Sequence, residues 1–202
     1  MTSTLTLQKL DETGRQLVFT GARTSNSFAD IPVDDEQLRE IWEMTRYMPT
    51  MANTQPLRVV FVRTPEGKAR LLPHIAEGNA AKTAAAPVTA ILAYDTDWHE
   101  EIPNVFPIRP EMKDHFAADE DARHAVGRHS AGLQEGAFIL AIRAAGLAAG
   151  PLGGYDGEGI DREFFPDGGW TTVMVVNIGH PGESPWFDRL PRVDAAKAVA
   201  WA

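Results

Sequence analysis

Apolar positions recur with helical spacing in several stretches of the chain. Asp34 and Gln37 have the spacing of a capping box, which predicts that a helix starts here. Its buried stripe is predicted at Leu38, Ile41, Trp42, Thr45 and Met48. A weaker helix is expected over residues 11–20, ended by Gly21.

Runs of β-branched and apolar residues predict strands over residues 57–63, 88–94 and 171–178, with a shorter strand over 147–150. The Val-Val-Phe-Val run in the first of these indicates burial on both faces. The mixture of strands and helices predicts a mixed α and β domain that covers residues 1–202.

Two further stretches differ in how regular they are. A long helix is predicted over residues 121–145, where Gly132 and Gly136 would let another backbone approach closely. Its buried stripe is predicted at Ala125, Val126, His129, Leu133, Gly136, Ala137, Leu140 and Ala144. Residues 95–120 contain three prolines and no clear period, so they form either short helices or a lid over a substrate.

Composition argues against several classes of partner and site. The net charge of −9 and the pI near 5.1 oppose a nucleic-acid or anionic-membrane partner. The absence of cysteine excludes disulfides and thiolate catalysis. No apolar run is long enough to span a bilayer and no secretory leader is evident, so a cytoplasmic protein is expected.

Several kinds of catalytic or ligand site are not supported. Neither a dinucleotide-binding glycine motif nor a P-loop is present. Ser130 is offset from the nucleophile-elbow pattern and lies within a predicted helix. His124 and His129 point to different helix faces, and the acidic residues between 95 and 101 are more typical of a solvated loop, so no metal site is assigned.

The loop over residues 48–58 contains two prolines and four polar side chains, between a helix and a strand. A rigid polar loop of this kind is either a ligand-contacting segment or an ordinary connection. Other polar patches lie at residues 23–27, at 79–82, and from Gly153 to Arg189. The arginine and hydroxyls of the first patch suit a phosphate.

Five short motifs follow one another along the chain: Arg-x-Ser, Pro-x-x-x-Asn-x-Gln-Pro, Asn-x-x-Lys, Pro-x-Gly-Gly and Arg-Leu-Pro. In order and spacing they resemble the FMN-dependent nitroreductase family over nearly the whole chain. Phrases such as Arg-Thr-Pro-Glu-Gly-Lys and Gly-Pro-Leu-Gly-Gly look most like its malonic semialdehyde reductase branch, which acts in pyrimidine degradation. The resemblance implies an α+β fold with a central, mostly antiparallel sheet flanked by helices. It also implies an intertwined homodimer with FMN sites at the interface.

The resemblance implies a role for particular residues. Arg23, Ser25 and Arg189 would hold the FMN phosphate, with further contacts from Thr24. The second subunit would contribute Pro49, Thr50, Met51 and Asn53. The pyrimidine edge of the flavin would meet Asn79 and Lys82, and one ring face would meet Pro151 and Leu152. Backbone N–H groups toward flavin N5 are implied for Gly153 and Gly154.

This sequence departs from the family at Ser27, where lysine is usual, and at Gly153, where glutamate is frequent. The departures leave the flavin potential and the acceptor open. Hydride transfer through a flavin requires no side-chain acid, so no catalytic residue is assigned.

The implied activity transfers hydride from NADH or NADPH through flavin N5 to a small organic acceptor. Malonic semialdehyde, reduced to 3-hydroxypropionate, is one acceptor, and Arg109 and Arg128 are candidates to bind its carboxylate. Residues 95–120 are expected to govern acceptor choice. The alternatives are a nitroaromatic or quinone reductase, a non-catalytic flavin-binding dimer, and a dimerisation module without a cofactor.

Overall fold

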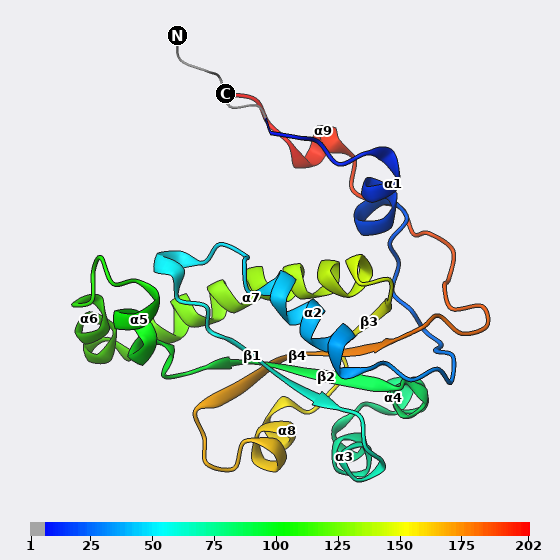
Figure 1. The fold of residues 1–202 in the computed structure, drawn as a ribbon, viewed down its shortest axis with the longest axis horizontal. Coiled ribbons are helices and arrows are strands. Elements are labelled where there is room, and N and C mark those ends of the chain that lie inside the picture. The colour runs from blue at the N-terminus through cyan, green and yellow to red at the C-terminus, as the bar shows by residue number, and fades with distance from the viewer. Residues whose placement is uncertain (1–6) are drawn as a thin grey trace.

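The computed structural model describes residues 7–202 and is organised around one antiparallel sheet (Figure 1). The strand order is β1 (Leu57–Val62), β2 (Val88–Asp95), β4 (Trp170–Gly179) and β3 (Ala148–Leu152). All three neighbouring pairs are antiparallel. The predicted α+β class with an antiparallel sheet is therefore confirmed.

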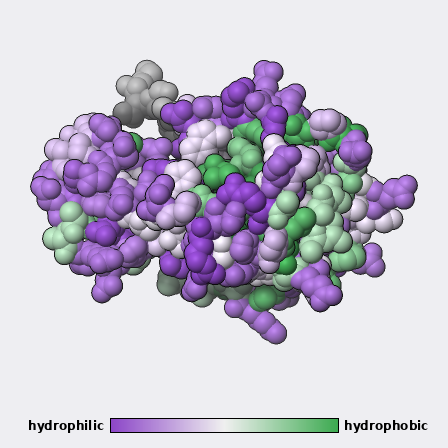
Figure 2. All heavy atoms as spheres, turned by 90° about the horizontal axis from the view of Figure 1, so that it is seen from below, coloured by the Kyte–Doolittle hydropathy of each residue, from purple (hydrophilic) through white to green (hydrophobic). Residues whose placement is uncertain are grey.

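Helices cover both faces of this sheet (Figure 1). One face carries α2 (Asp35–Thr45) and α7 (Glu120–Ala144), and the other carries α3 (Pro65–Leu71), α4 (Glu77–Ala85) and α8 (Gly157–Phe164). Each layer buries its own apolar cluster against the sheet. Seen from the side of α3 and α8, the surface is mostly hydrophilic, with apolar patches at its centre and toward the end that carries α4 (Figure 2).

Shorter elements complete the described chain. They are α1 (Glu12–Arg15), a π-helical turn (Gln16–Thr20), 3-10 turns (Met51–Asn53, Leu72–His74, Trp98–Glu101), α5 (Ile102–Val105), α6 (Met112–Ala118) and α9 (Ala195–Ala198). Helices α1 and α9 project beyond the body, on the same side of the sheet as α7 (Figure 1). Residues 95–120 are thus partly helical. Among residues 7–202, no helix is both long and apolar enough to cross a membrane.

The start of α2 follows directly from its sequence. The Asp34 carboxylate accepts from Gln37 N at 2.8 Å, and the Gln37 side chain accepts from Asp34 N at 3.2 Å. These two hydrogen bonds form the predicted capping box and satisfy donors that the first helical turn leaves free. Leu38, Ile41 and Thr45 are buried as expected, whereas Trp42 and Met48 are only half-buried, and Met48 lies beyond the end of the helix.

The predicted buried stripe of α7 is wrong. The residues that pack against the sheet and α2 are Gly127, Ser130, Ala131, Gln134, Phe138, Ala141 and Ile142. The predicted stripe lies largely on the other side: Leu133 is 37% exposed, and a Cβ built at Gly132 or Gly136 meets no atom within 4 Å. Small residues occupy both sides of this helix, so periodicity alone could not identify the buried one.

Gly21 ends the first helical segment as expected, and its φ of −83° is right-handed. The expected burial of β1 on both faces is wrong: most of the strand is half-buried because it lies at the edge of the sheet, where β2 is its only neighbouring strand within residues 7–202. By contrast, Gly146 has φ of +78° and ends α7 in the left-handed conformation expected of a glycine there.

Candidate functional site

Arginine side chains gather around a hollow of about 250 Å³ where the C-terminal segment crosses the segment that follows α1. Its lining comprises Arg23, Thr24, Asn26, Phe187, Asp188, Arg189, Leu190 and Arg192. Backbone carbonyls fix two of the guanidinium groups. Arg23 Nη1 donates to Phe187 O at 3.2 Å, and Arg189 Nη2 donates to Ala22 O at 3.3 Å.

The positive charge of this hollow, called the arginine hollow below, is only weakly offset. Within residues 7–202 no ion pair joins Arg23, Arg189 or Arg192 to a carboxylate, although Asp188 lies in the lining. Arg143, at the end of α7, donates to the carbonyl of Arg23, and burial together with the charge of Arg189 lowers its pKa. Guanidinium groups that lack a carboxylate partner fit a phosphate.

Ser25 is placed differently from its arginine neighbours. Its side chain is 1% exposed and its hydroxyl donates to Ser27 O at 2.8 Å, while its backbone N donates to Ala149 O at 2.9 Å. A Cβ at Gly150 would lie 2.7 Å from Ser25 O, so glycine there lets the segment approach β3. Ser25 therefore fixes the path of the backbone that carries Arg23 and Thr24. Its direct contact with a phosphate stays a prediction.

A second hollow, of about 470 Å³, lies beside the first and has α4 as one wall. Its lining comprises Asn26, Ser27, Phe28, Gly78, Ala81, Lys82, Ala85 and Phe187. Asn26 and Phe187 line both hollows, so the two adjoin. Lys82 Nζ donates to Asn26 Oδ1 at 3.4 Å, which brings the predicted pyrimidine-binding helix next to the predicted phosphate-binding segment.

The turn after β3 packs against the start of α4. Asn79 Nδ2 donates to Gly154 O at 3.2 Å, and a Cβ at Gly154 would lie 2.8 Å from the same nitrogen. Gly153 is open, because a Cβ there meets no atom within 4 Å. Pro151 is half-buried, whereas Leu152 is 5% exposed and belongs to the core beneath α3 and α8. This turn therefore offers mainly backbone and Pro151 to a ligand.

The loop over residues 48–58 is held in a strained form. Three residues that are not glycine have left-handed backbones, with φ of 47° at Ala52, 54° at Asn53 and 43° at Gln55. Thr50 Oγ1 accepts from Gln55 N at 3.2 Å, and Asn53 Nδ2 donates to Val105 O at 2.7 Å. Conformations of this kind cost about 1 kcal/mol or more each and persist only where surrounding contacts hold them.

This loop lies far from the other predicted residues of the same chain. In Figure 1 it lies near α5, whereas α4 and the arginine segments lie toward the opposite end of the molecule. Pro49 and Met51 are exposed there, and Met51 is 42% exposed. One chain therefore brings the predicted residues together as two separate groups.

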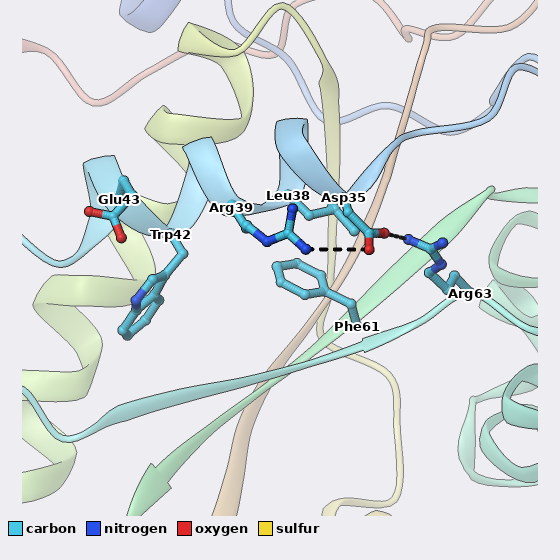
Figure 3. Close-up of a pocket in the computed structure, with 7 residues that line it drawn as sticks. All are labelled: Asp35, Leu38, Arg39, Trp42, Glu43, Phe61 and Arg63. Carbon is cyan, nitrogen blue, oxygen red and sulfur yellow. Dashed lines mark hydrogen bonds and ion pairs between the residues drawn. The ribbon is translucent and has the colours of Figure 1, made fainter.

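A third hollow, also of about 470 Å³, lies between α2 and β1 (Figure 3). Trp42 and Phe61 face its apolar interior, while Arg39 and Arg63 both pair with Asp35 at one end. None of the predicted cofactor residues lines this hollow. It is a separate surface at the free edge of the sheet.

Sequence reasoning missed several residues around the two adjoining hollows. Asn26 lies within the polar segment already noted, and Arg192 closes the Arg-Leu-Pro-Arg phrase, so both had a signal in the sequence. Arg143 and Phe187 had none, because their positions depend on the fold of the C-terminal segment over the end of α7.

A four-stranded antiparallel sheet between helical layers, with a cationic hollow beside it, defines an α+β protein with a candidate site for an anion. Residues 20–180 match the model of the nitroreductase family, and the chain belongs to that family.

Two relatives and one solved structure illustrate the match. A Streptomyces coelicolor protein is 56% identical over 185 residues, 92% of each chain, and a Streptomyces griseus protein is 50% identical over 94% of this chain and 96% of its own. Both carry the provisional name NADH dehydrogenase/NAD(P)H nitroreductase. A provisionally named nitroreductase from Exiguobacterium sibiricum, solved in complex with FMN, has a TM-score of 0.79 at 20% identity and covers 98% of this chain and 100% of its own. At this identity the likeness concerns the fold.

Proposed function

We propose that the protein is an FMN-dependent NAD(P)H oxidoreductase that works as a homodimer. Family membership and the NAD(P)H nitroreductase names of its relatives support this class. The observation that carries the proposal is the arginine hollow, whose guanidinium groups have no carboxylate ion pair within the described chain and which adjoins a hollow walled by α4. A flavin mononucleotide needs such a pair of sites, one for a phosphate and one for a ring.

The chain's own residues would bind the cofactor from several sides. Arg23 and Arg189 would hold the phosphate as bidentate donors, with Thr24 beside them and Ser25 fixing the backbone. When bound, FMN would supply hydride transfer between the nicotinamide and the acceptor.

Helix α4 and the turn after β3 would orient the ring. The Lys82 ammonium would stabilise negative charge on the pyrimidine edge of the reduced ring, and Asn79 would donate or accept beside it. Pro151 would lie against a ring face, and the backbone N–H groups of the open Gly153 and of Gly154, which packs against Asn79, would be donors toward flavin N5. Of Leu152 only the backbone is available, because its side chain is buried.

A second copy would complete each site with Pro49, Thr50, Met51 and Asn53. In the folded molecule their loop lies at the opposite end from α4 and the arginine segments, which supports this proposal. The open face of α7 around Gly132 and Gly136 supports it as well. The projecting N- and C-terminal segments expose large apolar side chains at Leu10, Leu17, Phe19, Phe187, Leu190, Val193, Val199 and Trp201. Exposed apolar segments of this extent are typical of surfaces that another chain covers.

Two classes of electron acceptor are proposed. A nitroaromatic acceptor agrees with the nitroreductase names of the relatives, with a quinone as a further alternative, while malonic semialdehyde agrees with the sequence phrases of its branch. Arg109 pairs with Glu111, and the Arg128 guanidinium lies 5.5 Å from the centre of the Tyr94 ring, so each would exchange an existing contact for a substrate carboxylate. The Asn53 to Val105 hydrogen bond links the flavin-contacting loop to α5, which supports residues 95–120 as the segment that governs acceptor choice.

Absorption of visible light by the purified protein is the first test. A yellow protein, or a colourless one that takes up one FMN per chain, is expected, and failure to take up FMN would overturn the proposal. Anaerobic assays with malonic semialdehyde, a nitroaromatic and a quinone then identify the acceptor. Steady NADH or NADPH oxidation with any acceptor excludes a non-catalytic flavin-binding dimer. Unchanged 3-hydroxypropionate formation in both Arg109→Ala and Arg128→Ala would remove those arginines from the substrate site.

A further inference from the structure

Four residues close a hydrogen-bonded ring in the interior, behind α4. Lys68 Nζ donates to Thr83 O at 2.7 Å and to Thr89 Oγ1 at 2.5 Å. Thr89 Oγ1 donates to Asn177 Oδ1 at 2.8 Å, and Asn177 Nδ2 donates to Thr83 Oγ1 at 3.0 Å. The ring joins α3, β2 and β4 to a single residue of α4, Thr83.

Burying this ring has a desolvation cost, because its members are polar. Thr83, Thr89 and Asn177 are each 0% exposed, and no ion pair joins Lys68 to a carboxylate within residues 7–202. Burial lowers the pKa of Lys68 to about 8. Apolar residues of similar size would fill the same volume without desolvating an amine. What apolar residues would not supply is a directional bond to one particular carbonyl group.

The bond that Lys68 makes is directed at the helix that forms one wall of the proposed cofactor site. Thr83 faces the core, whereas Lys82, the residue before it, lies in the hollow on the other side of α4. The start of α4 has no side-chain cap, since Ala76 occupies the N-cap position. Hydrogen bonds therefore hold α4 at two places: the ring acts near its C-terminal end, and Asn79 and the Ala76 backbone bond to Gly154 O near its start.

We propose that Lys68 is a positioning residue for the cofactor: by holding Thr83 from behind, it fixes the rotation of α4 and thereby the places of Lys82 and Asn79 at the pyrimidine edge. The inference rests on the proposed function, because it takes FMN to be the ligand of the α4 hollow. It assigns a functional consequence to a side chain that does not line that hollow.

The test compares three variants of the full-length protein. Lys68→Met removes the amine at nearly constant volume. Thr89→Val removes the hydroxyl that accepts from Lys68 and donates to Asn177, while Thr89→Ser keeps it. FMN affinity of the apoprotein is measured by fluorescence titration. Hydrogen exchange of the α4 backbone amides is measured without FMN, and the flavin reduction potential is measured in the loaded protein.

Lys68→Met and Thr89→Val should each weaken FMN binding about tenfold. The reason is that a shift of α4 would cost Lys82 one charged hydrogen bond to the flavin ring. Both should speed exchange of the α4 amides, and both should make the flavin potential more negative because Lys82 no longer meets the reduced ring in place. Thr89→Ser should stay within about threefold of the unaltered protein in affinity. Ile142→Val, a core change on the other face of the sheet, serves as a control that lowers stability but should leave FMN affinity and potential unchanged.

The outcomes separate this inference from the proposed function. If the unaltered protein binds no FMN, both are overturned. If it binds FMN and Lys68→Met and Thr89→Val bind it equally well with an unchanged potential, the ring is purely structural and only the inference is overturned. If Lys68→Met does not fold, the comparison of Thr89→Val with Thr89→Ser decides: equal affinities overturn the inference, and a selective loss in Thr89→Val supports it.

Discussion

Arg189 shows how a single side chain can be placed for a ligand by backbone contacts alone. Its guanidinium donates to Ala22 O at 3.3 Å, and its side chain lines the arginine hollow. The nearby Arg143 is half-buried, and the two charges repel, which is one reason that the pKa of Arg143 is lowered. A bound phosphate would relieve this repulsion, because its negative charge would attract both guanidinium groups.

Replacing Arg189 with alanine should weaken FMN binding by about tenfold to a hundredfold, because a charged hydrogen bond to phosphate contributes about 1.5–3 kcal/mol. The loss should shrink as salt rises, since salt screens the contact in the unaltered protein. Fluorescence titration at low and high salt measures both effects. Arg162→Ala on α8, where the side chain is 70% exposed and remote from the hollow, is the matched control. Equal losses in the two variants would contradict a specific phosphate contact.

Lys68 should also leave a signature in the pH dependence of stability. Its folded-state pKa of about 8 lies below the ordinary value of 10.5, so between these pH values the unfolded chain holds a proton that the folded chain has lost. The free energy of unfolding contributed by this residue should therefore rise as pH goes from about 8 to about 10.5, by roughly 2 kcal/mol after allowance for partial exposure. Urea unfolding of the apoprotein across this range, compared with Lys68→Met, measures the difference. A parallel pH profile in the two proteins would contradict the lowered pKa.

At the scale of elements, sequence pattern and structure agree wherever the signal is local. The capping box at Asp34 and the positions of the strands both follow from neighbouring residues. The buried face of α7 could not be read in the same way, since glycine and alanine lie on both of its sides and the choice depends on what packs there. Lys68 and Arg143 were missed for a related reason: their partners are distant in the chain.

The open face of α7 is predicted to be a dimer surface. Gly136→Glu should convert the protein to a monomer, because a charged side chain would enter a close helix contact, yet the chain should still fold since a Cβ at Gly136 meets no atom within 4 Å. Sedimentation velocity measures the oligomeric state, and circular dichroism measures the fold. Gly136→Ala, which adds a single methyl group, is the control and should retain far more dimer. A dimer that survives the glutamate unchanged would place the interface elsewhere.

For the molecule as a whole, the predicted cofactor residues form two groups that lie at opposite ends of the folded molecule. The motifs predict which residues belong to the site, but no local pattern predicts how far apart those residues lie in the folded chain. Distances of this kind arise only from the complete sheet and its two helical layers. The separation of the two groups therefore supports the proposed homodimer, in which each site would take one group from each chain.

Complementation between two defective chains tests that assembly. Arg189→Ala and Thr50→Pro should each bind FMN poorly as homodimers, and Thr50→Pro should also weaken the dimer. A mixed dimer contains one site with the intact arginine of one chain and the intact loop of the other, so it should bind one FMN with nearly unaltered affinity. Differently tagged copies, purified together and titrated with FMN, measure this. No recovery in the mixed dimer would indicate that both groups serve a site within one chain.

The edge position of β1 has a consequence for solubility. Half-buried Val59, Val60 and Phe61 lie on a strand with one unpaired side, next to the apolar hollow between α2 and β1. Such an edge can recruit a strand from another molecule, and short apolar runs of this kind are prone to aggregate. Arg58 and Arg63 flank the run: Arg58 is part-buried and paired with Asp95, whereas Arg63 is 45% exposed and paired with Asp35, so Arg63 is the charged side chain that guards this edge. Replacing Arg63 with valine should therefore increase precipitation during refolding, which light scattering measures.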